Sequence, residues 1–196
     1  MKRLPVLGLF GIIAASIISL GLGMGPAHAA SAWKEYAFPD LGIRKDFPNE
    51  PKRTKGTYKS PIVPETPAEI LTSEVDGVIY RMTVVPLKHQ NDEGASIMGE
   101  CSYISLTDAT KALADMASNF GFGRGGVYGR WTSGDRANGD RVVTACYFNK
   151  ANLYKIEAVI TRRHPNHPNS PMAMRFANSL DFNVDRDDSN SPTNQN

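Results

Sequence analysis

A turn signal, Asp76-Gly77, separates two runs of residues that favour β-strands. Both runs, 69–75 and 78–85, are rich in β-branched residues, and Asp-Gly between such runs is the usual signal of a tight hairpin. The even-numbered residues of the second run are apolar, whereas its odd-numbered residues are mixed. This alternation predicts a strand that is buried on one face. An antiparallel hairpin is therefore the firmest local prediction.

Further strands are predicted on both sides of this hairpin. The segment 31–68 contains six prolines, which prevents long regular elements there. One short strand fits between the prolines, and Gly-rich turns separate three more strands in the second half of the chain. We expect a hairpin turn at 149–152, and one side of the last strand should be wetter than the other because Lys155 and Glu157 share it. The four predicted strands cover 42–47, 127–132, 141–148 and 153–163.

Two helices complete the predicted fold. We expect a loop over 86–104 and then a helix, with Ser105 as its cap, Asp108 three residues on and Gly121 at its end. Apolar residues recur there at helical spacing and predict a stripe that faces the core; a cofactor-binding stripe is the alternative. A second helix begins with Ser170 as cap and Pro171 as first residue, and its predicted buried side is Met172, Phe176 and Leu180. The first stripe consists of Leu106, Ala109, Leu113, Met116 and Phe120.

Runs of strands with few helices between them predict an α+β fold with an antiparallel β-sheet. The sequence contains no internal repeats. We expect one globular domain over 30–184. The polar segment 185–196 has no apolar periodicity, which predicts a disordered tail.

The first residues have the three parts of a secretory signal. Lys2 and Arg3 precede an apolar stretch of about 17 residues, and Ala27-His28-Ala29 supplies small residues at the positions that a signal peptidase reads. We expect residues 1–29 to be a signal peptide that is cleaved after Ala29. An uncleaved membrane anchor is the alternative, but the stretch is short for a span and is interrupted by glycines and serines. The prediction is a periplasmic or secreted protein, with no integral membrane segment after processing.

Charge excludes some partners. The chain has 22 basic and 20 acidic residues, and the removal of Lys2 and Arg3 leaves equal numbers of the two. A near-neutral domain has no global field that attracts nucleic acid or an anionic membrane. The sequence therefore predicts no nucleic-acid partner.

The chain has two cysteines, Cys101 and Cys146. An even number in an exported chain favours a disulfide, because oxidising compartments preserve such bonds. Two buried free thiols are the alternative. A redox function is not indicated, because the sequence has no Cys-x-x-Cys motif.

Two short segments resemble a known group. Gly42 through Pro51 contains a Gly-apolar-x-x-x-Phe-Pro-x-x-Pro pattern, and 176–182 reads Phe-Ala-Asn-Ser-Leu-Asp-Phe. Both are similar to the opening and closing segments of PsbP-like domains, the extrinsic proteins of the oxygen-evolving complex and their uncharacterised bacterial exported relatives. The resemblance covers about 36–184 and implies an α/β/α sandwich whose antiparallel sheet is flanked by helices. It implies a non-catalytic protein that docks on partners. Lys45 departs from the pattern, since an apolar residue is usual there.

A search for catalytic and metal sites gives little. His164 and His167 could share a metal, but neighbouring prolines forbid a helix and no third ligand is nearby; a polar surface loop is the alternative. There is no Gly-x-Ser-x-Gly nucleophile motif. The glycine cluster 121–126 is predicted to follow a helix, whereas phosphate-binding loops precede one. We therefore predict no catalytic residue, no metal site and no cofactor.

The remaining functional signal is a group of arginine and aromatic residues at 124–147. Tyr128, Arg130 and Trp131 are residue types that are enriched at binding hot spots. They predict a partner-binding surface; the alternative is that Trp131 fills the core and Arg130 is solvated. The leading hypothesis is a non-catalytic domain that binds a protein or envelope partner. The rival is a small-ligand-binding protein or a hydrolytic enzyme whose site is assembled from loops, with His89, His164 or Cys101 beside a carboxylate.

Overall fold

The structure is a computed structural model that describes residues 33–87, 93–107, 111–112, 119–122, 128–162 and 171–183. The described residues belong to one compact unit, and the predictions for 1–29 and 185–196 lie outside them. Within the described ranges, no helix is long and apolar enough to cross a membrane. The elements in chain order are β1 Lys34–Phe38, the 3₁₀ turn η1 Pro39–Leu41, β2 Ile43–Phe47, β3 Lys52–Tyr58, β4 Thr66–Val75, β5 Val78–Pro86, α1 Gly94–Thr107, β6 Lys111–Ala112, β7 Asn119–Phe122, β8 Tyr128–Asp135, β9 Arg141–Asn149, β10 Asn152–Ile160 and α2 Pro171–Asn178.

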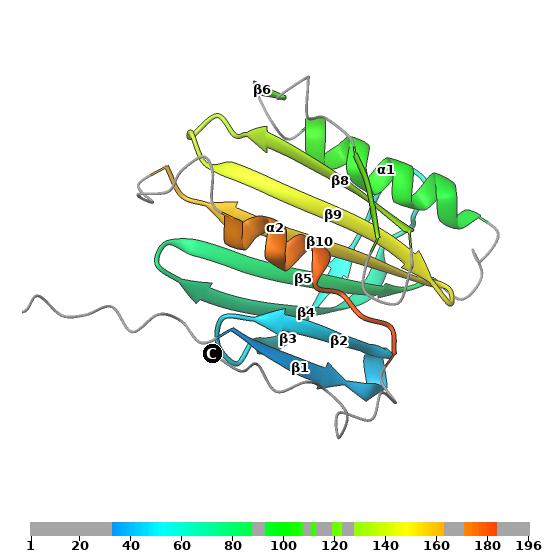
Figure 1. The fold of residues 1–196 in the computed structure, drawn as a ribbon. Helices are drawn as coiled ribbons and strands as arrows, with labels where there is room; N and C mark the ends of the chain where they lie inside the picture. The colour runs from blue at the N-terminus through cyan, green and yellow to red at the C-terminus, as the bar shows by residue number, and fades with distance from the viewer. Residues whose placement is uncertain are drawn as a thin grey trace, which may run out of the picture. The chain divides into compact units, whose positions relative to one another are not determined.

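The described strands form a large antiparallel sheet and a small two-stranded one. The large sheet has the order β3-β4-β5-β10-β9-β8-β6, and β7 also pairs with β8 (Figure 1). β1 pairs with β2 to form the small sheet. The two helices lie on opposite faces of the large sheet, because α1 is bonded to Cys146 of β9 and α2 contacts its neighbour Tyr147, whose side chain points the other way. The predicted α+β class, an antiparallel sheet flanked by helices, is confirmed.

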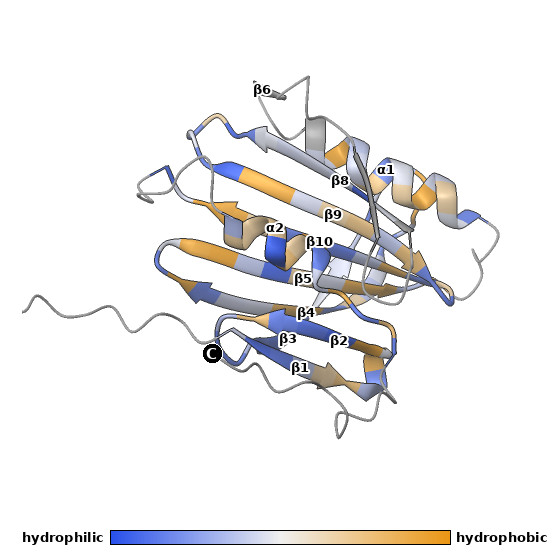
Figure 2. Ribbon diagram, viewed as in Figure 1, coloured by the Kyte–Doolittle hydropathy of each residue, from blue (hydrophilic) through white to orange (hydrophobic). Residues whose placement is uncertain are grey.

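Each face of the sheet has its own apolar core. The larger core lies under α2 and contains the inward residues of β5, β9 and β10 together with Phe47 and Phe176. The smaller core lies under α1 and includes Ile97, Leu153 and both cysteines. Figure 2 shows apolar residues concentrated along the central strands. β10 separates its residues as predicted: Tyr154 and Ile156 face the α2 core, and Lys155 and Glu157 form an ion pair on the other side.

The local predictions around turns are confirmed. β4 and β5 pair through the Asp76-Gly77 turn, where both residues have positive φ, 51° and 75°. β9 and β10 are joined by the predicted turn at 149–152. β2 occupies the short stretch between prolines, and α2 begins at Pro171. Each of these elements begins or ends at a turn residue or a proline.

The prediction of the first helix is wrong. α1 covers 94–107, most of which was expected to be loop, so Ser105 lies in its last turn and donates a hydrogen bond to the carbonyl of Cys101, 2.9 Å away, instead of capping it. Phe120 and Gly121 lie in β7, which pairs with β8. Leu106 of the predicted stripe lies in the last turn of α1, and Ala109, Leu113 and Met116 lie outside the described residues. Local propensity failed because α1 contains two glycines and three serines, and its place is fixed by tertiary contacts.

The buried side of α2 differs by one position from the prediction. Met172 is 39% exposed, whereas Ala173, Phe176 and Ala177 are buried. These three follow the i, i+3, i+4 spacing of one helix face. Leu180 is buried as predicted but follows the end of the helix.

Lys45 has a structural reason to depart from the apolar pattern. Its side chain is fully buried, and its Nζ donates hydrogen bonds to the carbonyl of Phe176 and, over 2.7 Å, to Ser179 Oγ. The last carbonyls of a helix lack partners within the helix and carry partial negative charge. Lys45 therefore fastens the end of α2 to β2. Next to it, Asp46 forms an ion pair with Arg175 of α2 at 3.2 Å.

Candidate functional site

The structure separates two of the three residues that were predicted to bind a partner. On β8, Arg130 lies opposite Cys146 and Trp131 lies opposite Ala145, so their side chains leave opposite faces of the sheet. The Arg130 guanidinium extends to α1, where a methyl group on Gly99 would lie 3.5 Å from its Nη1 atom. Trp131 is partly buried against the α2 core. The side chain of Tyr128 lies outside what the structure describes.

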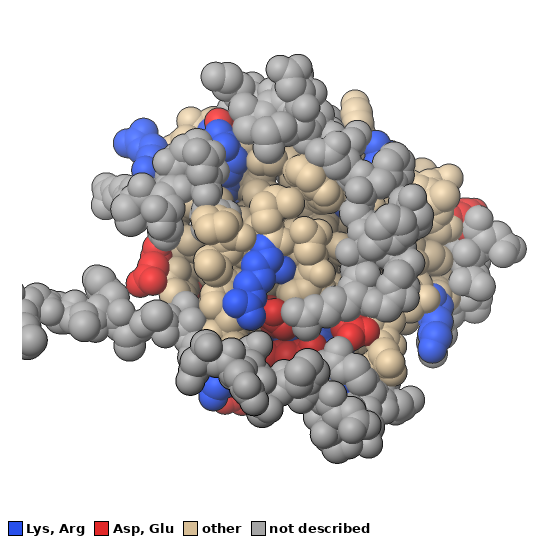
Figure 3. Space-filling view, viewed as in Figure 1, with Lys and Arg blue, Asp and Glu red and all other residues tan. Residues whose placement is uncertain are grey.

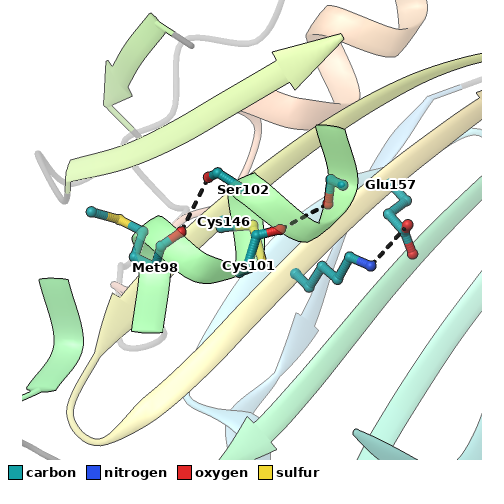
Figure 4. Close-up of a disulfide and its surroundings, with 7 residues drawn as sticks. Met98, Cys101, Ser102, Cys146 and Glu157 are labelled. Atoms are coloured by element: carbon teal, nitrogen blue, oxygen red, sulfur yellow. Dashed lines mark hydrogen bonds and ion pairs between the residues drawn. A yellow bond between two sulfur atoms is a disulfide. The ribbon is translucent and has the colours of Figure 1, made fainter. Parts of the chain in front are cut away.

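Cys101 and Cys146 form a disulfide that ties α1 to β9. Both residues are fully buried, and their Cα atoms are 6.3 Å apart. Figure 4 shows the bond beneath α1, with Ser102 donating back to the carbonyl of Met98. A bonded Cys101 cannot act as a nucleophile. Among the rival hypothesis's other residues, His89 and His164 lie outside the described residues, as does His167.

A pocket lies where the β9–β10 turn, β3–β5 and η1 meet, and we call it the hairpin-end pocket. Its volume is about 590 Å³, and it is half open to solvent. Its walls come from six separate segments of the chain, so no local motif marks it. The lining residues are Pro39, Asp40, Leu41, Gly42, Arg53, Glu69, Val84, Pro86, Asn149, Lys150, Asn152, Tyr154 and Phe182.

The charges on one wall of the pocket hold one another in place. Arg53 of β3 contacts Asp40 Oδ2 through its Nη2 atom at 2.6 Å and Glu69 Oε2 through its Nε atom at 3.0 Å. The hydrogen bond from Arg53 lowers the pKa of Asp40, and the two carboxylates raise the pKa of Arg53. All three groups are partly or largely exposed, so the pairs contribute little stability. Their effect is to fix where the charges lie. The Tyr154 hydroxyl, 3.3 Å from the Leu41 carbonyl, anchors η1 beside them.

The β9–β10 turn, which also lines the pocket, is strained. Lys150 and Ala151 have φ values of 46° and 59°, in the left-handed region that Gly and Asn adopt more readily. This conformation costs roughly 1–2 kcal/mol at each non-glycine residue. The Leu87 backbone N–H donates to the Ala151 carbonyl at 2.7 Å and helps to hold the turn. Positive φ at both central residues is what a two-residue hairpin turn requires, so the pairing of β9 with β10 holds this conformation. The turn places the exposed Lys150 on the rim of the pocket.

Two smaller hollows flank β3. One, of about 180 Å³, adjoins the hairpin-end pocket and shares Glu69 and Pro86 with it. The other, of about 400 Å³, lies on the α1 side of the sheet and is rich in hydroxyl groups. Tyr58 lines this hollow. Its burial, and to a smaller extent the Glu100 carboxylate, raises the pKa of Tyr58 to about 12. Its lining residues are Thr54, Thr57, Tyr58, Ile70, Thr72, Arg81, Thr83, Lys155 and Glu157.

Charges on the molecular surface are mixed. On the face drawn in Figure 3, acidic and basic side chains of the described residues lie in small groups rather than in one patch of a single sign. The described residues contain no cluster of three or more His, Cys, Asp or Glu side chains that could hold a metal ion. The structure therefore directs attention to the hairpin-end pocket and to β3 beside it.

Comparisons with known proteins add little to this geometry. No family model matches the chain, and no curated protein matches it. Among solved structures, it is similar to the solution structure of cyanobacterial PsbP (CyanoP) from Synechocystis sp. PCC 6803, with 12% identity and a TM-score of 0.47 over 82% of this chain and 98% of that one. The fold itself rests on the strand pairing described above.

Proposed function

We propose that the mature chain is an exported, non-catalytic domain that binds a protein or envelope partner, and that the hairpin-end pocket is the centre of its binding surface. The secretory pattern of 1–29 and the buried disulfide both support a location outside the cytoplasm, because structural disulfides persist in oxidising compartments. We propose that this location is either the periplasm or the exterior of the cell.

The observation that carries the proposal is the preorganised charge in the pocket. Arg53 is fixed by two carboxylates, and the strained turn contributes Lys150 to the same pocket. A surface whose polar groups are already ordered loses less entropy when a partner binds. Leu41, Tyr154 and Phe182 add apolar contact area to the same lining. A centre with apolar area and a charged rim is the usual anatomy of a protein interface.

The same pocket is poorly suited to acid–base catalysis. Its two carboxylates, Asp40 and Glu69, are both paired with Arg53, and the pKa of Asp40 is lowered further from the range that a general acid needs. The lining residues include no serine, cysteine or histidine. A polar small ligand is the second candidate, because the volume of the pocket falls within the range of ligand sites.

A second contact surface, at Tyr128, Arg130 and Trp131, remains part of the proposal. Since Arg130 and Trp131 leave opposite faces of β8, a partner would contact one of them without the other. The double substitution Tyr128→Ser, Arg130→Ser tests the α1 side of this surface separately from the pocket.

The test is recovery of a partner from envelope extract with a charge-swapped pocket. The variant Asp40→Lys, Lys150→Glu exchanges two exposed rim charges and keeps the net charge. The matched control, Glu50→Lys, Arg162→Glu, makes the same exchange at exposed positions outside the pocket lining. We expect the wild type and the control to recover the same protein, identified by mass spectrometry, and the pocket variant to recover at least about tenfold less.

Three results would count against the proposal. Equal recovery by the pocket variant removes the pocket as the binding surface. Loss only in the Tyr128→Ser, Arg130→Ser variant moves the surface to β8. A small molecule retained by the wild type in native mass spectrometry, with no protein recovered, favours the ligand-binding alternative.

A further inference from the structure

Among the described strands, β3 is an edge of the large sheet. It pairs with β4 along all of Lys52–Tyr58, and no described strand pairs with its other side. Each residue of β3 is exposed or half-exposed. The unpaired N–H and C=O groups of an edge strand form a template on which a further strand can add. The strand has no bulge in its register with β4 and no proline within it.

Hollows on both faces of β3 suit an added strand. Successive side chains of a strand point to opposite faces of the sheet. On the α2 side an added strand would place side chains near the hairpin-end pocket and the adjoining hollow, which are lined by Arg53 and Lys55. On the α1 side it would place them near the hydroxyl-rich hollow, which is lined by Thr54 and Tyr58. Pockets for alternate side chains next to a free edge are the features of peptide recognition by strand addition.

The charge of this edge selects the occupant. Residues 52–60 contain four basic side chains and no acidic one. Arg53 is neutralised by Asp40 and Glu69, whereas Lys52, Lys55 and Lys59 are exposed. We propose that the edge of β3 binds an extended acidic peptide segment of the partner by strand addition. This rests on the proposed function, since it names the chemical class of the partner and the backbone that receives it.

Basic residues on an edge strand also oppose self-association, and that effect disfavours a second copy as the occupant. Two β3 edges side by side would bring Lys52 and Lys55 close to lysines of the same charge, which destabilises a pair. A strand edge that is only protected against self-association does not need hollows on both of its faces. The hollows and the charge together favour a peptide of opposite charge.

The experiment uses two capped peptides as long as β3, one of alternating Glu and Val and one of alternating Lys and Val. Each is titrated into isotope-labelled protein, and the backbone amide signals are followed by NMR. We expect the acidic peptide to shift amides of β3 and to slow hydrogen exchange at alternate β3 positions. The variant Lys52→Glu, Lys55→Glu should bind it at least about tenfold more weakly. The control variant Lys34→Glu, Arg162→Glu carries the same charge change at exposed sites elsewhere and should bind as the wild type does.

Several outcomes overturn the inference. One is the absence of β3 shifts at about 1 mM acidic peptide; another is equal binding of the basic peptide. Self-association through β3, measured by analytical ultracentrifugation, would make a second copy the occupant. Heparin binding without binding of the acidic peptide would show a general polyanion surface. If the partner is recovered from envelope extract but the Lys52→Glu, Lys55→Glu variant retains it, the inference fails and the proposed function stands.

Discussion

Loss of the Cys101–Cys146 disulfide should weaken the folded state severely. The bond joins residues 45 apart in the sequence. On the chain-entropy model, cross-linking a loop of this length stabilises the folded state by about 4 kcal/mol. In a domain of this size, each 1 kcal/mol shifts the melting temperature by roughly 2–4 °C. The double variant Cys101→Ala, Cys146→Ala should therefore melt about 8–16 °C below the wild type.

The effect should be largest at α1. Few of its residues are buried, and Ile97 and Cys101 are its main apolar contacts with the sheet. We expect faster hydrogen exchange in α1 of the double variant than in β9 or β10, because elements with few buried contacts open first.

The assay is thermal unfolding followed by circular dichroism, with and without a strong reductant. The reductant should lower the melting temperature of the wild type and leave that of the double variant unchanged. This comparison separates the cross-link from the packing of the two sulfur atoms. Equal melting temperatures for the oxidised wild type and the double variant, or two free thiols in the denatured, unreduced protein, would refute the reasoning.

Two further predictions follow from strain and burial. Replacing the strained turn by Lys150→Asn, Ala151→Gly should raise the melting temperature by about 4 °C or more and weaken partner recovery, because Asn-Gly fits this turn but removes the lysine; unchanged stability would mean that the turn is relaxed. Burial raises the pKa of Tyr58, Tyr80 and Tyr147 to about 12, from the usual 10.0. Their stabilising contribution is complete below pH 10 and is lost as the pH rises to about 12. Phenolate absorbance near pH 10 in the folded protein, at the level of the unfolded chain, would contradict this.

Elements bounded by strong local signals were predictable from the sequence. The Asp76-Gly77 turn defined the β4–β5 hairpin because those residues tolerate positive φ. Pro171 marked the start of α2 for a similarly local reason. The disulfide was predictable from the even number of cysteines in a chain that is expected to be exported. The sequence did not indicate which two elements the bond would join.

The predictions that failed concern features that depend on contacts between segments far apart in the sequence. α1 has weak helix-forming residues and is held by Ile97 and Cys101 against the sheet, so its own sequence did not identify it. The apolar spacing that suggested a later helix includes Phe120, which lies in a strand paired with β8. The hairpin-end pocket was not predictable from the sequence, because Asp40, Arg53 and Lys150 are far apart in the chain and come together only when the sheet forms.

The central claim is that a partner contacts the pocket end of the sheet in the intact envelope. The direct measurement is site-specific photocrosslinking, with a photoreactive residue at position 55 on the β3 edge, at position 150 on the turn, or at position 162 as a control away from both. The account predicts crosslinks from positions 55 and 150 to one and the same envelope protein, and none from position 162. Crosslinks from position 162 alone, or from all three positions to unrelated proteins, would contradict it.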